Sequence, residues 1–196
     1  MRKVVLYSLL SIDGVAEEPG NWLFDADDGL IENLGRVIGK QDAVLLGRGT
    51  FDYWVGYWPS SNHEPFASFI NTTSKYIFTS TTPTSDWPAS TIVSAPAAEY
   101  VADLKRVDGA DIGIHGSISL ARSLLQAELV DELRLVVAPT VASHGRRLFG
   151  VDEGPLQRFD LTDVDRTSTG LLLLGYAKRE SPRRGRDDPA VFLRTS

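Results

Sequence analysis

Apolar runs alternate with amphipathic stretches along the first two thirds of the chain, and this alternation predicts strands separated by helices. The apolar runs are short enough to be buried strands, and the stretches between them carry apolar residues at helical spacing. The predicted strands span residues 3–10, 42–47, 75–79, 91–94, 111–115 and 132–139. The predicted helices span residues 28–38, 96–106 and 117–127, and residues 50–72 are expected to be helical or irregular.

The pattern changes after the last of these helices. Residues 156–165 and 171–178 form two strand-like runs, and the polar stretch between them indicates a hairpin. Parallel crossovers followed by a hairpin predict an α/β fold with a mixed, mostly parallel sheet covered by helices on both faces. Residues 1–179 therefore form one domain, and the charged residues 180–196 are expected to be a mobile tail.

The strand predicted at 111–115 runs directly into Gly116 and Ser117, and an amphipathic helix follows. Glycine allows a ligand to approach the backbone closely, and serine is a favoured N-cap residue. The N-terminus of a helix favours an anion such as a phosphate. An ordinary strand–turn–helix would have the same sequence, so this site depends on support from other elements. The candidate pyrophosphate ligands are Gly116, Ser117, Ile118 and Ser119.

Two more predicted strands end in residues of the same kinds. Arg48 offers a planar set of donors that suits a phosphate, and Thr50 is expected to cap the following helix. Such residues also occur in ordinary turns. Three strand ends of this kind nevertheless favour a phosphate-rich ligand, because ligands of open α/β sheets bind beyond the carboxyl ends of strands. The further candidate ligands are Gly47, Arg48, Thr50, Thr79, Ser80 and Thr81.

Four motifs, in this order and spacing, resemble the dihydrofolate reductase-like superfamily. The likeness is greatest to the reductase domain at the C-terminus of bifunctional deaminase-reductases of riboflavin synthesis, and it covers roughly residues 3–179. The motifs lie at residues 11–15, 46–51, 116–120 and 129–141, with 145–149 behind the last. The resemblance implies a three-layer fold, NADPH as the cofactor, hydride transfer to a small heterocycle, and a homodimer. The deaminase zinc signature of the bifunctional proteins is absent from the sequence.

The resemblance also implies where the chemistry takes place. It aligns Trp22 with the loop beside the nicotinamide, and the next helix start with a carboxylate that assists protonation of the substrate. Asp25, Asp27 and Asp28 are the candidates for this carboxylate, and Asp27 and Asp28 are chosen together with Trp22. Acidic residues at a helix start also cap the helix, so that alternative stays open. The distance in sequence to Gly47 is longer than in the folate enzymes, which weakens dihydrofolate as the substrate, and water can supply the proton instead.

A substrate pocket is expected between the Trp22 loop and residues 51–58, opening toward Gly116. A flat heterocycle needs apolar faces and a few directed polar groups. The aromatic segment 51–58 can supply such faces, and its alternative role is packing in the core and in a dimer. The candidate substrate contacts are Asp13, Phe24, Phe51 and Trp54.

Composition narrows the function further. The net charge of −6 argues against general binding of nucleic acid, which requires a basic face. The absence of cysteine excludes thiolate metal sites and suits the cytoplasm, and the three histidines are too far apart in sequence for a metal site. No run approaches the ~20 apolar residues of a membrane-spanning helix. The alternative to a reductase is a nucleotide-binding module that keeps the phosphate site without turnover.

The strand pattern gives a reason for the implied homodimer. The runs 133–138 and 171–177 are largely apolar on both faces, and few helices follow residue 127 to cover them. A partner subunit related by a two-fold axis could provide the cover. The alternative is that the helices of one subunit already cover both faces. Asp131 and Glu132, just before the first of these runs, are expected in a solvated turn.

Overall fold

The computed structural model of the chain describes residues 1–150 and 154–179, and eight strands of this part form one sheet. The order across the sheet is β4-β3-β2-β5-β1-β6-β8-β7. The strands are β1 (Val4–Leu10), β2 (Gln41–Gly47), β3 (Ser74–Phe78), β4 (Ser90–Val93), β5 (Asp111–His115), β6 (Glu132–Val137), β7 (Phe159–Arg166) and β8 (Leu172–Lys178). The helices are α1 (Asp28–Ile38), α2 (Arg48–Trp54), α3 (Phe66–Thr72), α4 (Ala97–Leu104) and α5 (Ile118–Gln126), with short 3-10 turns at Pro19–Asn21 and Trp58–Ser60. The tail expected over residues 180–196 lies outside the described residues.

The sheet is parallel from β4 through β6, and β8 and β7 then add an antiparallel pair. The predicted α/β fold with a mixed, mostly parallel sheet and a closing hairpin is therefore confirmed. The strand predicted to end at residue 139 ends instead at Val137, because Pro139 has no N–H group to donate to the sheet. No helix in the described ranges is long and apolar enough to cross a membrane.

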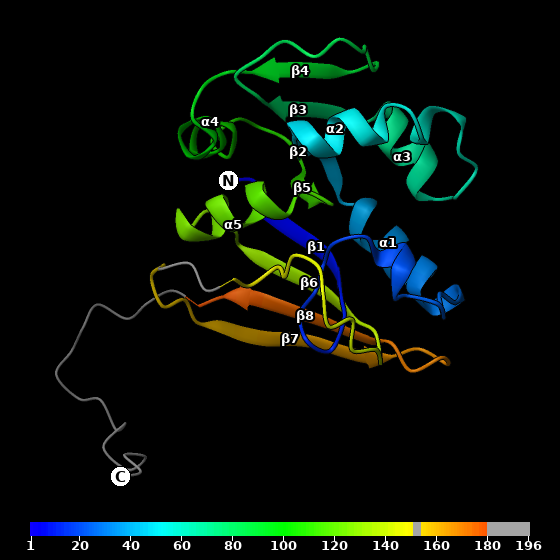
Figure 1. Ribbon diagram of the computed structural model, residues 1–196. Helices are drawn as coiled ribbons and strands as arrows, with labels where there is room; N and C mark the ends of the chain where they lie inside the picture. Colours follow the sequence, from blue (N-terminus) through cyan, green and yellow to red (C-terminus); the bar gives the residue numbers. More distant parts are fainter. Residues whose placement is uncertain (151–153, 180–196) are drawn as a thin grey trace, which may run out of the picture.

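Helices cover both faces of the parallel part of the sheet (Figure 1). On one face, α4 and α5 bury a cluster that includes Leu6, Leu45 and Leu124. On the other face, α1, α2 and α3 pack over two clusters, one around Phe51 and one around Trp22. Side chains alternate between the faces of a strand, so neighbouring strand residues enter different clusters. The three layers implied by the resemblance are therefore present.

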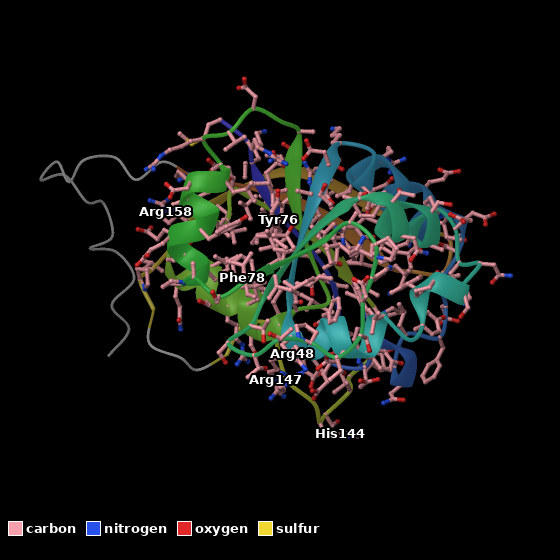
Figure 2. All side chains as sticks on the ribbon, turned by 90° about the horizontal axis from the view of Figure 1, so that it is seen from above. Arg48, Tyr76, Phe78, His144, Arg147 and Arg158 are labelled. Atoms are coloured by element: carbon pink, nitrogen blue, oxygen red, sulfur yellow. The ribbon has the colours of Figure 1, made fainter. Side chains whose placement is uncertain are left out.

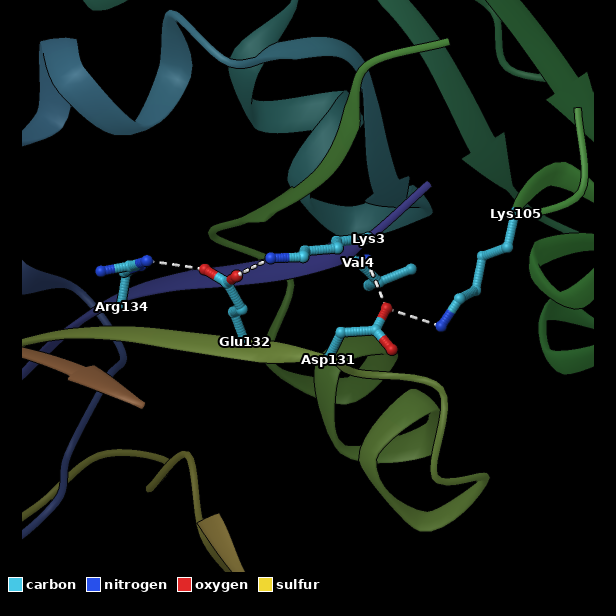
Figure 3. A network of polar contacts seen from close by, with 6 residues as sticks. All are labelled: Lys3, Val4, Lys105, Asp131, Glu132 and Arg134. Carbon is cyan, nitrogen blue, oxygen red and sulfur yellow. Dashed lines mark hydrogen bonds and ion pairs between the residues drawn. The ribbon is translucent and has the colours of Figure 1, made fainter. Parts of the chain in front are cut away.

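Carboxylates hold the amino-terminal edge of the sheet together (Figure 3). Asp131 accepts hydrogen bonds from the backbone N–H of Val4 and from Lys105 Nζ, at 2.7 and 2.6 Å. Glu132 accepts from Lys3 Nζ at 2.7 Å and from Arg134 at 2.6 Å. The expectation of a solvated turn at this point is wrong, since Glu132 already belongs to β6 and both carboxylates hold the start of β6 to the start of β1.

Candidate active site

The candidate ligand-binding residues gather where the parallel strands end. Strands β1, β2, β3, β5 and β6 run in the same direction, so the loops that follow them share one edge of the sheet. In Figure 2, Arg48, Arg147 and His144 are labelled along the same side of the molecule. This edge is the place where an open α/β sheet binds its ligand.

The turn from β5 into α5 requires glycine. Gly116 has φ of +65°, which residues with a Cβ rarely adopt. A Cβ added at this position would lie 2.6 Å from Cζ2 of Trp54, which packs against the turn. The backbone at Gly116 is exposed to solvent and open to a ligand.

A chain of hydrogen bonds joins this turn to the end of β2. Ser117 Oγ donates to Thr50 Oγ1 at 3.0 Å and accepts from the backbone N–H of Gly47 at 3.0 Å. Thr50 in turn donates to the carbonyl of Gly116 at 3.2 Å. Ser117 occupies the N-cap position of α5, but its side chain makes no capping hydrogen bond. The first N–H groups of α5 therefore remain available to an anion.

The expectation that Thr50 caps the following helix is wrong. Helix α2 begins at Arg48, and Gly47 is its N-cap residue. Thr50 thus lies inside the first turn, and its hydroxyl faces the β5–α5 turn instead. The same residue types that suggest a cap in the sequence here connect two strand ends.

Arg48 lies between an aspartate and the loop after β3. Its Nε donates to both carboxylate oxygens of Asp52, at 2.8 and 2.7 Å, one helical turn along α2. Its Nη1 donates to the carbonyl and the hydroxyl of Thr81, at 3.0 and 2.8 Å. Thr79 Oγ1 donates to the same carbonyl at 2.8 Å. The structure therefore brings Arg48 together with Thr79 and Thr81, which are two of the hydroxyl residues that the sequence indicated as phosphate ligands.

Asp13 joins the loop after β1 to the loop after β6. Its carboxylate accepts from Ser11 Oγ at 2.7 Å, from the N–H groups of Ala142 and Ser143 at 2.9 and 3.1 Å, and from Arg147 at 3.2 Å. The hydrogen bonds from Ser11 and from the Ala142 backbone lower the pKa of Asp13 to about 2. The carboxylate is ionised near neutral pH and holds the two loops in register.

Arg146 links the α5 end of this edge to the loop after β1. Its Nε donates to Glu17 Oε1 at 2.5 Å, and its backbone N–H donates to Glu17 Oε2 at 3.0 Å. Its Nη1 lies 3.5 Å from Ser119 Oγ in the first turn of α5. These contacts, with the backbone N–H of Arg146 foremost, hold the pKa of Glu17 below its usual value. The phosphate-type site at α5 is thus continuous with the loop that contains Trp22.

A cavity of about 330 Å³ opens beside Trp22. Its apolar lining comes from Trp22, Phe24, Val141 and Ala142. Its polar lining comes from Glu17, Glu18, Asn21, Thr140 and His144. Trp22 is held in place because its Nε1 donates to the carbonyl of Glu17 at 2.8 Å. Two aromatic rings and several directed polar groups suit a small flat molecule.

A second cavity, of about 230 Å³, lies at the opposite edge of the sheet. It is lined by residues such as Arg36, Lys40 and Asp111, near the end of α1 and the beginning of β5. The glycine turns and hydroxyl groups described above are all at the other ends of these strands. The cavity beside Trp22 is therefore the candidate substrate site.

Comparisons with known proteins agree with this geometry. Residues 2–173 match the sequence family described as the RibD C-terminal domain. The chain belongs to this family. A curated relative, the uncharacterized protein YyaP of Bacillus subtilis (strain 168), is 28% identical over 184 residues, which cover 89% of this chain and 94% of YyaP. Membership confirms the resemblance to the reductase domain of riboflavin deaminase-reductases.

Solved structures show the same fold at low sequence identity. A candidate riboflavin biosynthesis protein from Shewanella sp. PV-4 matches with a TM-score of 0.70 at 17% identity, covering 91% of this chain and 99% of that one. A pyrimidine reductase-like protein from Corynebacterium diphtheriae matches with a TM-score of 0.64 at 17% identity, covering 92% and 93%. The bifunctional diaminohydroxyphosphoribosylaminopyrimidine deaminase/5-amino-6-(5-phosphoribosylamino)uracil reductase of Thermotoga maritima matches with a TM-score of 0.64 at 16% identity, over 91% of this chain and 57% of that protein.

In this RibD C-terminal domain, the aromatic residues predicted to contact the substrate do not all line the cavity. Phe24 is 74% exposed and lines the cavity. Phe51 is 1% exposed and packs in the core near Trp87, so its ring has no free face. Trp54 contacts the Gly116 turn rather than the cavity. Of the segment 51–58, no residue lines the cavity beside Trp22.

Asp27 is held by donors from two sides. It is the N-cap of α1, where Oδ1 accepts from the N–H of Leu30 at 3.1 Å. Its Oδ2 accepts from Ser168 Oγ at 2.8 Å and from Thr169 at 3.1 to 3.2 Å. Desolvation raises the pKa of this carboxyl, but these hydrogen bonds outweigh it and hold the pKa well below its usual range. Neither Asp27 nor the exposed Asp28 lines the cavity.

Sequence reasoning did not select Glu17, Glu18, Thr140 or His144, which line the cavity. They lie in two loops that are far apart in sequence, and the isolated bridge between Val15 and Arg147 brings these loops together. A contact between two loops leaves no periodic pattern of apolar residues from which it could be predicted. His115, in contrast, is buried beside Gln41, and burial lowers its pKa to about 3, so it is a neutral packing residue. Within the described ranges, no group of three acidic, histidine or cysteine residues is arranged to hold a metal ion.

Proposed function

We propose that this protein is an NADPH-dependent reductase that transfers a hydride to a small heterocyclic substrate. One observation carries the proposal: the uncapped start of α5, with its glycine turn, is continuous through Arg146 with a cavity lined by Trp22 and Phe24. The first part suits a pyrophosphate and the second a flat ring. The family supports a reductase of the riboflavin-pathway type, and the solved structures with the same fold include a bifunctional deaminase/5-amino-6-(5-phosphoribosylamino)uracil reductase.

The residues at the carboxyl edge fit the cofactor. Gly116 allows the turn its φ of +65° and is exposed at the edge of the sheet, and the N–H groups of Ile118 and Ser119 begin a helix whose dipole favours negative charge. Arg48 with Thr79 and Thr81 would hold the 2′-phosphate that distinguishes NADPH from NADH. When bound, the cofactor supplies the hydride, and the protein orients its ring and shapes the electrostatics around it.

The proton that accompanies the hydride comes from water in this proposal. Asp27 keeps its negative charge near neutral pH, because four hydrogen bonds stabilise the ionised form. A carboxylate of this kind is a poor proton donor. Its role is then to fix the start of α1 against the β7–β8 turn at Ser168 and Thr169, beside the loop that carries Trp22.

The test combines a binding measurement with a screen for turnover. NADPH is titrated against the protein with tryptophan fluorescence as the signal, and its oxidation is then followed with pterins, dihydrofolate and ribosylamino-pyrimidines. We expect NADPH to bind and at least one heterocycle to be reduced. If NADPH binds and no heterocycle is reduced, the protein is a nucleotide-binding module; if NADPH does not bind, the proposal is wrong.

We also propose that the protein is a homodimer that pairs through the outer face of β7 and β8. Leu161, Val164 and Leu172 are 55%, 60% and 41% exposed. Leu161 pairs with Tyr176 and Val164 pairs with Leu174, and Leu172 lies two positions before Leu174 in β8. Alternate residues of a strand share a face, so the three exposed side chains lie on one face of the hairpin. Strand β6, by contrast, is covered by the subunit's own clusters on both faces. A partner is therefore needed only at the antiparallel end of the sheet.

Light scattering tests the dimer. The wild-type protein should have twice the chain mass of 21.5 kDa at micromolar concentration. Val164→Asp should give a monomer, because a charge in the interface is costly to bury. Val107→Asp is the matched control, since Val107 is 58% exposed and lies away from the hairpin. A wild-type mass near 21.5 kDa would disprove the dimer.

A further inference from the structure

The charge around the cavity beside Trp22 is unfavourable for a phosphate. Two carboxylates, Glu17 and Glu18, line this cavity, and His144 is its one lining residue that can become positive. An enzyme that binds a phosphorylated sugar places arginine or lysine on the phosphate, because those side chains pair with it through charged hydrogen bonds. Neither residue type lines this cavity within the described part of the chain.

The arginines near the cavity already pair with carboxylates. Arg146 is bonded to Glu17, and the side chain of Arg147 donates to the backbone carbonyl and the carboxylate of Asp13. Arg48, further along the edge, pairs with Asp52. To meet a substrate phosphate, Arg146 or Arg147 would have to leave a carboxylate that also holds the two loops together. The two arginines beside the cavity are thus neutralised before any substrate enters.

Glu18 differs from these paired residues. Its side chain lines the cavity and makes no hydrogen bond or ion pair with any described residue. Its backbone has φ of +45°, a conformation that is uncommon outside glycine, and its carbonyl accepts from the N–H of Asn21 at 2.9 Å. Uncommon backbone conformations of this kind are concentrated at functional sites. An unpaired acceptor with a negative charge is therefore held at the cavity by a fixed turn.

We propose that the cavity binds an unphosphorylated, amino-substituted heterocycle, and that Glu18 accepts hydrogen bonds from its N–H groups. This inference rests on the proposed function and narrows its substrate class. The exposed Phe24 would contact a face of the ring beside the largely buried Trp22, while Glu18 selects for amino groups and against phosphate. Like charges repel across a partly desolvated site. The carboxylate of Glu18 therefore attracts a ligand with amino groups and disfavours a ligand with a phosphate.

A matched pair of ligands tests the substrate class. A ribosylamino-pyrimidine nucleoside and its 5′-phosphate differ only in the phosphate, and their binding to the NADP⁺-loaded protein is measured by calorimetry. We expect the nucleoside to bind at least about 10-fold more tightly than its 5′-phosphate. Tighter binding of the 5′-phosphate, or binding of neither ligand, would overturn the inference. Oxidation of NADPH by the same ligands is recorded separately, so that failure of turnover is distinguished from failure of selectivity.

Glu18→Gln locates the effect. Loss of the charge should weaken binding of the nucleoside about 5- to 10-fold and should reduce its advantage over the 5′-phosphate, while affinity for NADPH stays the same. Glu128→Gln is the matched control, because Glu128 is also exposed and also has a positive φ, of 57°, but lies beyond the end of α5. If Glu18→Gln changes neither ligand's affinity, Glu18 does not contact the substrate and the inference is wrong.

Discussion

The carboxyl edge of the sheet has two halves that differ in the charged groups they present to a ligand. The half formed by β2, β3 and β5 presents a glycine turn, hydroxyl groups and Arg48 around the start of α5. The half formed by the loops after β1 and β6 presents Glu17 and Glu18 beside two aromatic rings. In the proposed function the first half holds the phosphates of the cofactor, and the second excludes a phosphorylated substrate.

This difference is instructive because both halves contain arginines. Arg146 and Arg147 occur as adjacent cations in the sequence, yet both are bonded to carboxylates of the loop after β1. They connect the loop after β6 to the loop after β1. The sign of charge available to a ligand therefore depends on which cations are already paired, and their number in the sequence does not reveal it.

Among these substitutions, Gly116→Ala should cause the largest loss of cofactor affinity. The new Cβ would force a left-handed alanine and a clash 2.6 Å from Trp54. These effects cost about 1–2 and 1–3 kcal/mol respectively. If the cofactor requires the present backbone, affinity falls by roughly 30- to several-thousand-fold. Calorimetric titration should show this loss for NADPH and NADH alike.

Gly49→Ala is the control for this substitution. Gly49 lies in the first turn of α2 at the same edge of the sheet, has no positive φ, and has nothing within 4 Å of an added Cβ. Cofactor affinity should remain at the wild-type value. If the Gly116→Ala protein bound NADPH as tightly as the wild-type protein, the cofactor would not use the β5–α5 turn.

Arg48→Ala should separate the two cofactors. A hydrogen bond to a charged group contributes roughly 1.5–3 kcal/mol, so NADPH should bind about 10- to 150-fold more weakly. NADH has no 2′-phosphate and should bind almost as before. Arg106→Ala is the control, since Arg106 also pairs with a nearby helical aspartate but is exposed on the surface. Equal losses for NADPH and NADH would place Arg48 outside the 2′-phosphate site.

The sequence indicated which residues gather in the first half of the edge, because these residues lie at the ends of strands. The apolar runs locate the strands, Gly47 is the last residue of β2 and Gly116 follows β5 directly, so parallel order alone brings these residues to one edge. The cavity was harder to predict. Glu18 and His144 belong to loops that meet through loop-to-loop hydrogen bonds, such as those accepted by Asp13.

Packing also decided roles that residue type left open. Phe51 and Trp54 are three positions apart on α2, and the aromatic character of their segment suggested a pocket wall. Phe51 instead fills the core with Trp87, and Trp54 supports the Gly116 turn. Both outcomes depend on which face of α2 packs against the sheet. Helix α2 has only seven residues, and the apolar pattern of so short a helix does not specify its buried face.

Substitutions of Asp27 test its role next to the acidic half. If Asp27 only fixes the start of α1, Asp27→Ala should lower the melting temperature by a few degrees, and Asp27→Asn should lower it less because asparagine is also a good N-cap. Turnover measured at a temperature where both variants are folded should then stay near the wild-type value. A similar large loss of kcat in both variants would instead show that the carboxylate assists protonation.

Asp13 provides the smallest effect and tests whether carboxylates hold the acidic half together. Its pKa of about 2 in the folded protein lies below the value of about 3.9 for an unfolded chain. The ionised form therefore stabilises the fold above pH 4, and this contribution is lost as the pH falls from about 4 to 2. In Asp13→Asn, the urea midpoint should be lower at pH 6 and should depend less on pH over that interval. Asp86→Asn, which removes an exposed carboxylate that makes no hydrogen bond with the described residues, should follow the wild-type curve. An unchanged acid dependence in Asp13→Asn would mean that the two loops are held by their backbone bridge and not by this carboxylate.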